Sequence, residues 1–182
     1  MAVTTQEIRA TLTRYLERHP GEAGDLQPLR QALNAGAELS SRSEFNSGHV
    51  TCGAVVLGHD NRLLLIQHKA LNIWLLPGGH LEPSDEGLPA AALRELEEET
   101  GISWHHAIAP PGHDVVPVDI DVHAIPPNPA KGEPSHWHAD FRYLFRVTEP
   151  QIHIQVTEVD GYAWLAPGEA PTPKLAAKIT SL

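Results

Sequence analysis

The chain has 182 residues, of which 41% are hydrophobic and 20% charged, and its formal net charge at pH 7 is −10. These values predict one ordinary globular domain with an appendage. The acidic charge argues against proteins that coat nucleic acids or bind membrane surfaces, because both need a basic face. The single cysteine, Cys52, excludes an internal disulfide and a cysteine-based zinc site. Without a signal-peptide pattern or a run of 18 apolar residues, we expect a cytoplasmic protein.

Residues 1–45 are expected to form a helical hairpin appended to a domain that covers residues 46–182. Thr4 and Glu7 have the spacing of a capping box at the start of the first helix. Three roles are open for the hairpin: packing on the main domain, forming a homodimer, or covering the substrate site. The polar segment 40–47 marks the domain boundary.

From residue 48 the pattern changes to that of β-strands. We predict strands at residues 49–57, 62–68 and 73–76, after which Gly78 and Gly79 open a loop. Beyond a central helix, we predict an edge strand at 115–122, a proline-stiffened loop at 125–135, strands at 139–147 and 162–165, and a helix at 173–182. The 125–135 loop has two interpretations, a substrate lid or an ordinary surface loop.

The most informative stretch is the helix predicted near residues 89–100, which Gly101 ends. Glu95, Glu98 and Glu99 share one face of this helix at i, i+3 and i+4. Like-charge neighbours cost about 0.2–0.5 kcal/mol each, and the helix dipole disfavours anions here by about 0.3–1 kcal/mol each. A solvated acidic face is the alternative, but a bound cation would relieve this repulsion. Carboxylate oxygens suit Mg²⁺, or else Mn²⁺.

This stretch resembles the signature of the Nudix hydrolases, G-x5-E-x7-R-E-U-x-E-E-x-G-U, in which U is aliphatic. Residues 94–102 match its second half in full, and Gly79 supplies the first glycine. The intervening loop carries one extra residue, so the first acidic position falls on Asp85 or Glu86. The resemblance implies an α/β fold, an α/β/α sandwich around a mixed β-sheet, with the helical hairpin added at the N-terminus.

The resemblance also implies a hydrolase that cleaves a diphosphate linkage in a nucleoside diphosphate joined to another moiety. ADP-ribose-like molecules and nucleoside triphosphates both fit this description. The three helix glutamates would hold Mg²⁺ with a backbone carbonyl of Gly79. Glu98 would accept a proton from the attacking water, and Arg94 would orient Glu98. Glu158 is a further candidate metal ligand, with Asp160 as its alternative.

Other side chains are candidates for contacts with the substrate, namely His80, His138 and Arg142. His136 and His138 stand at i and i+2 of an extended segment, so both should face the same side. A His-x-His zinc site would need further ligands, and the sequence shows no third one. Exposed histidines without a mechanistic role are therefore the default interpretation, contact with the substrate is the favoured functional one, and a zinc site stays open as the less favoured alternative.

Two other functions remain open. A Nudix-like module that senses nucleotides without cleaving them could lose the helix glutamates at little cost, whereas all three are present. An isoprenoid diphosphate isomerase would need acid–base partners for a carbon skeleton, and Cys52 is the only cysteine available for that role. No motif in the 125–135 loop identifies the substrate.

Overall fold

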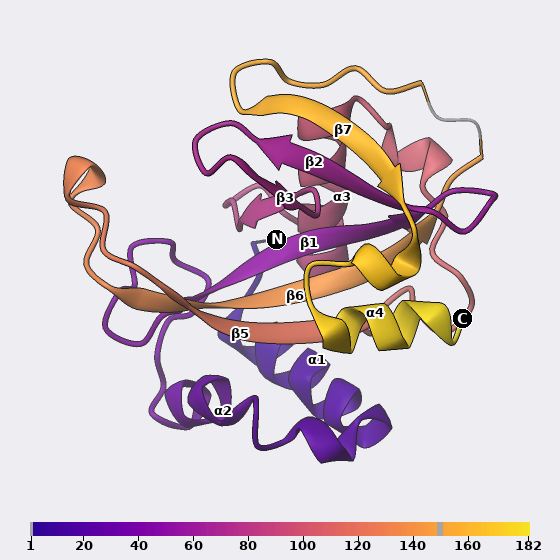
Figure 1. The fold of residues 1–182 in the computed structure, drawn as a ribbon. Coiled ribbons are helices and arrows are strands. Elements are labelled where there is room, and N and C mark those ends of the chain that lie inside the picture. Colours follow the sequence, from indigo (N-terminus) through magenta and orange to yellow (C-terminus); the bar gives the residue numbers. More distant parts are fainter. Residues whose placement is uncertain (1, 149–150) are drawn as a thin grey trace.

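The computed structural model describes residues 2–148 and 151–182, and its centre is a seven-stranded sheet (Figure 1). The strand order is β3-β2-β1-β6-β5, and β4 pairs with β1 while β7 pairs with β2. The sheet is mixed because β1 and β6 are parallel and the other pairs are antiparallel. The strands are β1 (His49–Leu57), β2 (Leu63–His68), β3 (Ile73–Leu75), β4 (Gly78–His80), β5 (Asp119–Ile125), β6 (His136–Arg146) and β7 (Val159–Leu165).

Helices cover both faces of the sheet, which confirms the predicted sandwich. They are α1 (Thr5–Arg18), α2 (Gln27–Asn34), α3 (Leu88–Thr100) and α4 (Pro173–Thr180). Apolar side chains of α1, α2 and α3 share one hydrophobic core with Phe141 and Tyr143 of the sheet. Residues of α4 pack instead with Val55 and Leu144 in a second core. None of the described helices combines the length and the hydropathy that a membrane crossing requires.

The N-terminal hairpin packs on the main domain, and one of its glutamates contacts the central helix. Thr4 caps α1 as predicted, because its hydroxyl accepts a hydrogen bond from the Glu7 amide at 3.2 Å. The predicted capping box is wrong in its second half, since Glu7 Oε1 accepts from the Leu88 amide at 3.0 Å. Leu88 begins α3, where the first amides have no partner within the helix. The hairpin therefore supplies a capping group to α3.

Two parts of the sheet differ from the sequence prediction. Residues 78–80 form β4 instead of a loop, because β2 pairs with β1 only near Leu57 and leaves backbone groups of β1 free for β4. The predicted strand 115–122 lies later, at β5, since Pro117 has no N–H to donate. The proline-rich segment connects β5 to β6 at the tip of a hairpin that projects from the sheet (Figure 1).

Candidate active site

Arg94, in the middle of α3, organises the charged residues around this helix. Its Nε and Nη2 donate to the two carboxylate oxygens of Asp85 at 2.8 and 3.1 Å. Its Nη1 donates to Glu95 Oε1 and to Glu98 Oε2, both at 3.0 Å. A further bond from Nη2 reaches the backbone carbonyl of His80 at 2.9 Å. The predicted contact with Glu98 is present, and Arg94 also ties α3 to the preceding loop.

Asp85 holds this loop in place. Its side chain is buried, and Oδ2 accepts from the Glu82 amide at 2.7 Å in addition to the bonds from Arg94. Glu86, the other candidate for the first acidic position of the signature, is exposed. Asp85 thus makes the contacts that shape the loop. The spacing of the signature could not decide between Asp85 and Glu86, because the answer depends on which part of the loop accommodates the extra residue.

The carboxylates of Glu95 and Glu99 are held against β4. Glu99 Oε2 accepts from the Gly78 amide at 2.9 Å, and the residue is only 5% exposed. Burial raises the pKa of Glu99 to about 8, against the hydrogen bond from Gly78, and burial raises the pKa of Glu95 to about 7. Both groups are thus poorly solvated as anions near neutral pH.

Gly79 is the residue that lets Glu95 approach the strand. A Cβ atom at Gly79 would lie 2.5 Å from Glu95 Oε1, so a larger residue would push this carboxylate away. A Cβ at Gly78 would instead lie 2.6 Å from the backbone oxygen of Cys52. The two adjacent glycines are therefore needed for different reasons, one for a side chain and the other for the backbone of β1.

We predict that alanine at Gly79 affects mainly activity, whereas alanine at Gly78 affects mainly the stability of the fold. Gly79→Ala should displace the flexible Glu95 carboxylate, which would lower the hydrolytic activity implied by the resemblance by about 10²-fold and change stability by less than about 0.5 kcal/mol. Gly78→Ala should destabilise the fold by about 1–3 kcal/mol, because a backbone must move. Urea unfolding and initial rates measure both effects. Equal destabilisation by the two substitutions would contradict this assignment.

The donor set on this face of α3 fits a divalent cation. Three carboxylates lie along the last two turns, two of them largely buried, and Arg94 is the cation that contacts Glu95 and Glu98. Hard oxygen donors of this kind suit Mg²⁺ or Mn²⁺. The negative charge of Glu158 contributes to the raised pKa of Glu99.

The stability of the metal-free protein should fall as pH rises from about 4.5 to 8. Glu95 and Glu99 have folded pKa values of about 7 and 8 against an ordinary value of 4.5, so the folded state holds their protons longer than the unfolded state does. Mg²⁺ held by these two carboxylates would bind their ionised forms and should therefore raise Tm more at pH 8 than at pH 6. Thermal unfolding of wild type and Glu99→Gln measures this. A Mg²⁺ effect that is equal at both pH values in wild type would contradict it.

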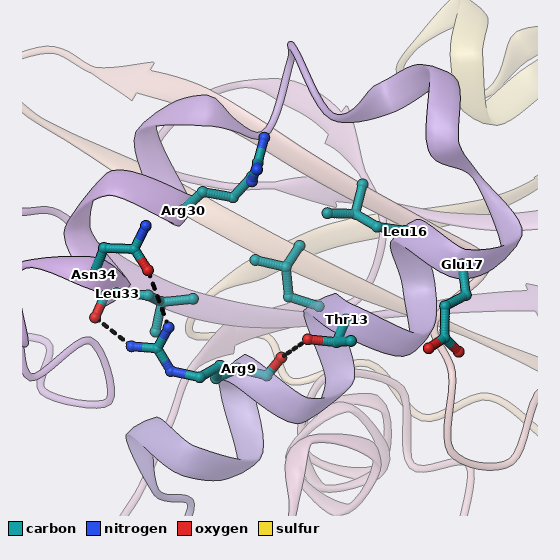
Figure 2. Close-up of a pocket in the computed structure, with 8 residues that line it drawn as sticks. Arg9, Thr13, Leu16, Glu17, Arg30, Leu33 and Asn34 are labelled. Atoms are coloured by element: carbon teal, nitrogen blue, oxygen red, sulfur yellow. Dashed lines mark hydrogen bonds between the residues drawn. The ribbon is translucent and has the colours of Figure 1, made fainter.

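A hollow of about 570 Å³ opens on the outer side of α3, beside Arg94 and Glu98. Trp104, which is 55% exposed, lines the same hollow and stacks on His105 with 3.6 Å between ring centroids. The sequence pattern did not single out Trp104 as part of a site. A second hollow, of about 420 Å³, lies between α1 and α2 and contains no signature residue (Figure 2).

The predicted role of Arg142 in substrate binding is not supported by its surroundings. Arg142 is 6% exposed, and its guanidinium nitrogens form ion pairs of 2.9–3.1 Å with three aspartates. Two of these, Asp119 and Asp121, lie on the neighbouring strand β5, and Asp140 lies on β6 itself. All three guanidinium nitrogens of Arg142 thus donate hydrogen bonds to aspartates within the protein. Arg142 is a structural ion-pair centre instead of a free phosphate ligand.

His80 and His138, the other predicted substrate contacts, lie together in a cluster of histidines. Their ring centroids are 5.2 Å apart, and His49 lies 5.0 Å from His80 and 4.5 Å from His138. The prediction that His136 and His138 face the same side is confirmed, with 3.1 Å between their Nε2 atoms. The sequence showed no clear third ligand beside His136 and His138, but β1 and β4 bring His49 and His80 to β6.

Cys52 is fully buried in the core, and burial raises the pKa of its thiol. This confirms the expectation that Cys52 is a small core residue. A buried thiol is poorly suited to the acid–base role that an isomerase would require of it.

Comparison with known proteins decides the family. The model of the NUDIX domain matches residues 48–181. The chain belongs to the NUDIX family. Its NUDIX region is 31% identical over 113 residues to a probable DHNTP pyrophosphohydrolase of Lactococcus lactis, an alignment that covers 62% of this chain and 63% of the relative. A putative 8-oxo-dGTP diphosphatase of Bacillus subtilis is 30% identical over 119 residues, with 64% and 66% covered.

The NUDIX fold is also found among solved structures. An Ap4A hydrolase of Caenorhabditis elegans superposes with a TM-score of 0.56 at 19% identity, covering 72% of this chain and 95% of that one. At this identity, the likeness shows the fold. The chain spans 63% and 66% of the lengths of these two curated relatives, which is less than two thirds in each case.

Proposed function

We propose that this NUDIX protein hydrolyses a diphosphate linkage in a nucleoside diphosphate joined to another moiety, with Mg²⁺ as its cofactor. The observation that carries the proposal is the set of carboxylates around Arg94 and Gly79. Asp85 and Arg94 fix the loop, Arg94 fixes Glu98, and the missing side chain of Gly79 admits Glu95. This arrangement supports the signature's metal-binding role and requires no covalent enzyme intermediate.

Each glutamate has a distinct proposed task. Glu95, Glu98 and Glu99 would hold Mg²⁺, helped by the backbone carbonyl of Gly79, and Glu158 is the candidate for further assistance. When bound, the ion would neutralise the diphosphate and lower the pKa of a coordinated water. Glu98 is the most exposed of the three, and its carboxylate would accept the proton of the attacking water. Arg94 positions Glu98 through the hydrogen bond across one helical turn.

The test is a substrate panel with Mg²⁺, in which an added phosphatase releases phosphate from the cleaved products. The Bacillus subtilis relative carries the name putative 8-oxo-dGTP diphosphatase, so purine deoxynucleoside triphosphates come first, followed by ADP-ribose and dinucleotides. We expect turnover of at least one compound, abolished by EDTA and restored by Mg²⁺ or Mn²⁺. Tight nucleotide binding with no turnover across the panel would overturn the proposal and indicate a sensing module.

A further inference from the structure

Four histidines that are distant in the sequence meet at one end of the sheet. His49 begins β1, His80 ends β4, and His136 and His138 begin β6. The strand register explains their meeting, because His49 pairs with His138 across the parallel strands and Thr51, two residues after His49, pairs with His80. Paired residues and i, i+2 neighbours point to the same face of a sheet. The imidazoles are thus directed toward one another by the backbone.

The spacing of three of these imidazoles suits a metal ion. Ligand nitrogens of His49, His80 and His138 all lie within 4.8 Å of one another. Three atoms this close can all lie within about 2.8 Å of a common centre, and Zn–N bonds are about 2.0–2.1 Å long. A contraction of about 0.7 Å would complete the coordination. Among the described residues, the carboxylates of α3 form no comparably close group.

One hydrogen bond fixes the orientation of the buried His49 ring so that Nε2 can bind a metal ion. It is 1% exposed, and its Nδ1 lies 3.2 Å from the backbone oxygen of Glu44. Donation from Nδ1–H to this carbonyl leaves a lone pair on Nε2, which is buried and has no hydrogen-bond partner among the described residues. Histidine ligands usually donate their second N–H to a carbonyl in this way. Packing alone would leave this polar atom unsatisfied.

His136 makes a similar hydrogen bond through Nδ1 and lies beside His49 and His138, with ring centroids 4.9 and 5.0 Å away. Its Nδ1 lies 2.8 Å from the backbone oxygen of Pro134, which leaves Nε2 facing Nε2 of His138 at 3.1 Å. Two ligands of a tetrahedral zinc ion are separated by about 3.3–3.4 Å. The separation of His136 from His138 is therefore compatible with a shared ion, and His136 lies outside the group of three mutually close nitrogens. Because imidazole suits zinc and similar transition metals while Mg²⁺ prefers oxygen, this donor set differs from that of α3.

We propose that His49, His80 and His138 form a transition-metal site, with Zn²⁺ as the ion and His136 as the neighbouring imidazole that completes the coordination. The site joins the start of β1 to β4 and β6. His80 directly follows Gly79, against which the Glu95 carboxylate packs. An ion bound to His80 would therefore fix the end of β4 next to Glu95. The site is separate in chemistry from the proposed Mg²⁺ site, and neither proposal depends on the other.

The test is zinc binding by the full chain after treatment with a chelator. A chromophoric chelator that competes for Zn²⁺ should reveal one equivalent bound, and Co²⁺ in its place should give the intense visible absorption of a tetrahedral site. His49→Gln and His138→Gln should each weaken binding by at least about 100-fold, because even outer-shell changes cost about 10–100-fold. His106→Gln, which changes an exposed histidine outside the cluster, should bind as wild type does.

Two further measurements distinguish the zinc site from the carboxylates of α3 and cover the case in which a histidine variant does not fold. Glu98→Gln should retain the zinc site, which separates it from the carboxylates of α3. If His49→Gln does not fold by circular dichroism, His80→Gln and X-ray absorption of the zinc-loaded wild type replace it, with at least three imidazole nitrogens expected around the ion. Absence of a stoichiometric site, or zinc binding unchanged in the folded histidine variants, would overturn the proposal.

Discussion

Glu98→Gln is expected to lower kcat by about 10²–10⁴-fold, which is the usual contribution of a positioned general base. The substitution keeps the size of the side chain and a hydrogen-bond acceptor for Arg94, but it removes the group that would take the proton of water. Because Glu98 is half-exposed, the fold should be unaffected. Steady-state rates with the substrate found in the panel, together with a thermal unfolding curve, measure this prediction.

Glu97→Gln is the matched control for this experiment. Glu97 is the adjacent glutamate of α3 and is exposed, and no described hydrogen bond joins its side chain to Arg94. The control variant removes the same charge from the same turn, so it should keep near wild-type activity. Activity that survives Glu98→Gln unchanged, or equal losses in both variants, would contradict the role proposed for Glu98.

Arg94→Met is expected to lower the free energy of unfolding by about 3–5 kcal/mol, because it leaves the buried Asp85 carboxylate without its ionic partner. For a chain of this size, the loss corresponds to a fall in Tm of roughly 10 °C. Hydrolysis should fall as well, since Glu95 and Glu98 lose the donor that positions them. Urea unfolding and kcat measure the two effects.

Three variants separate charge from geometry at this position. Arg94→Lys keeps the charge but lacks the planar fork, so it should recover part of the stability while activity stays about 10–100-fold low. Asp85→Asn combined with Arg94→Met should cost less than the two single changes together, since the buried charge is gone. Arg14→Met, at an exposed position of α1, should change stability by less than about 0.5 kcal/mol. Additive effects of the Asp85 and Arg94 changes would contradict the coupling.

Local sequence signals predicted the elements around the site well. Helix α3 runs from Leu88 to Thr100 against a predicted 89–100, because Gly101 takes the left-handed conformation with φ of 69° and ends it. Strand β1 was predicted with its observed bounds, since its residues are strand formers. The contact from Arg94 to Glu98 follows from i, i+4 spacing alone.

Contacts between segments far apart in the chain could not be predicted from local sequence patterns, because they depend on strand register and tertiary packing. Glu7 has the spacing of a capping box, yet it caps Leu88, 81 residues away. Arg142 has the appearance of a free cation until the register of β5 and β6 places aspartates around it. His49 and His80 could join the histidines of β6 only through a pairing that no motif encodes.

The most direct test of the account is a crystal structure with Mg²⁺ and a substrate analogue whose diphosphate linkage cannot be cleaved. We predict an ion bound by carboxylate oxygens of Glu95, Glu98 and Glu99 and by oxygens of the diphosphate, with Arg94 still bonded to Glu98. A bound analogue whose ion contacts none of these glutamates, or glutamates turned into solvent in the complex, would contradict the central claim.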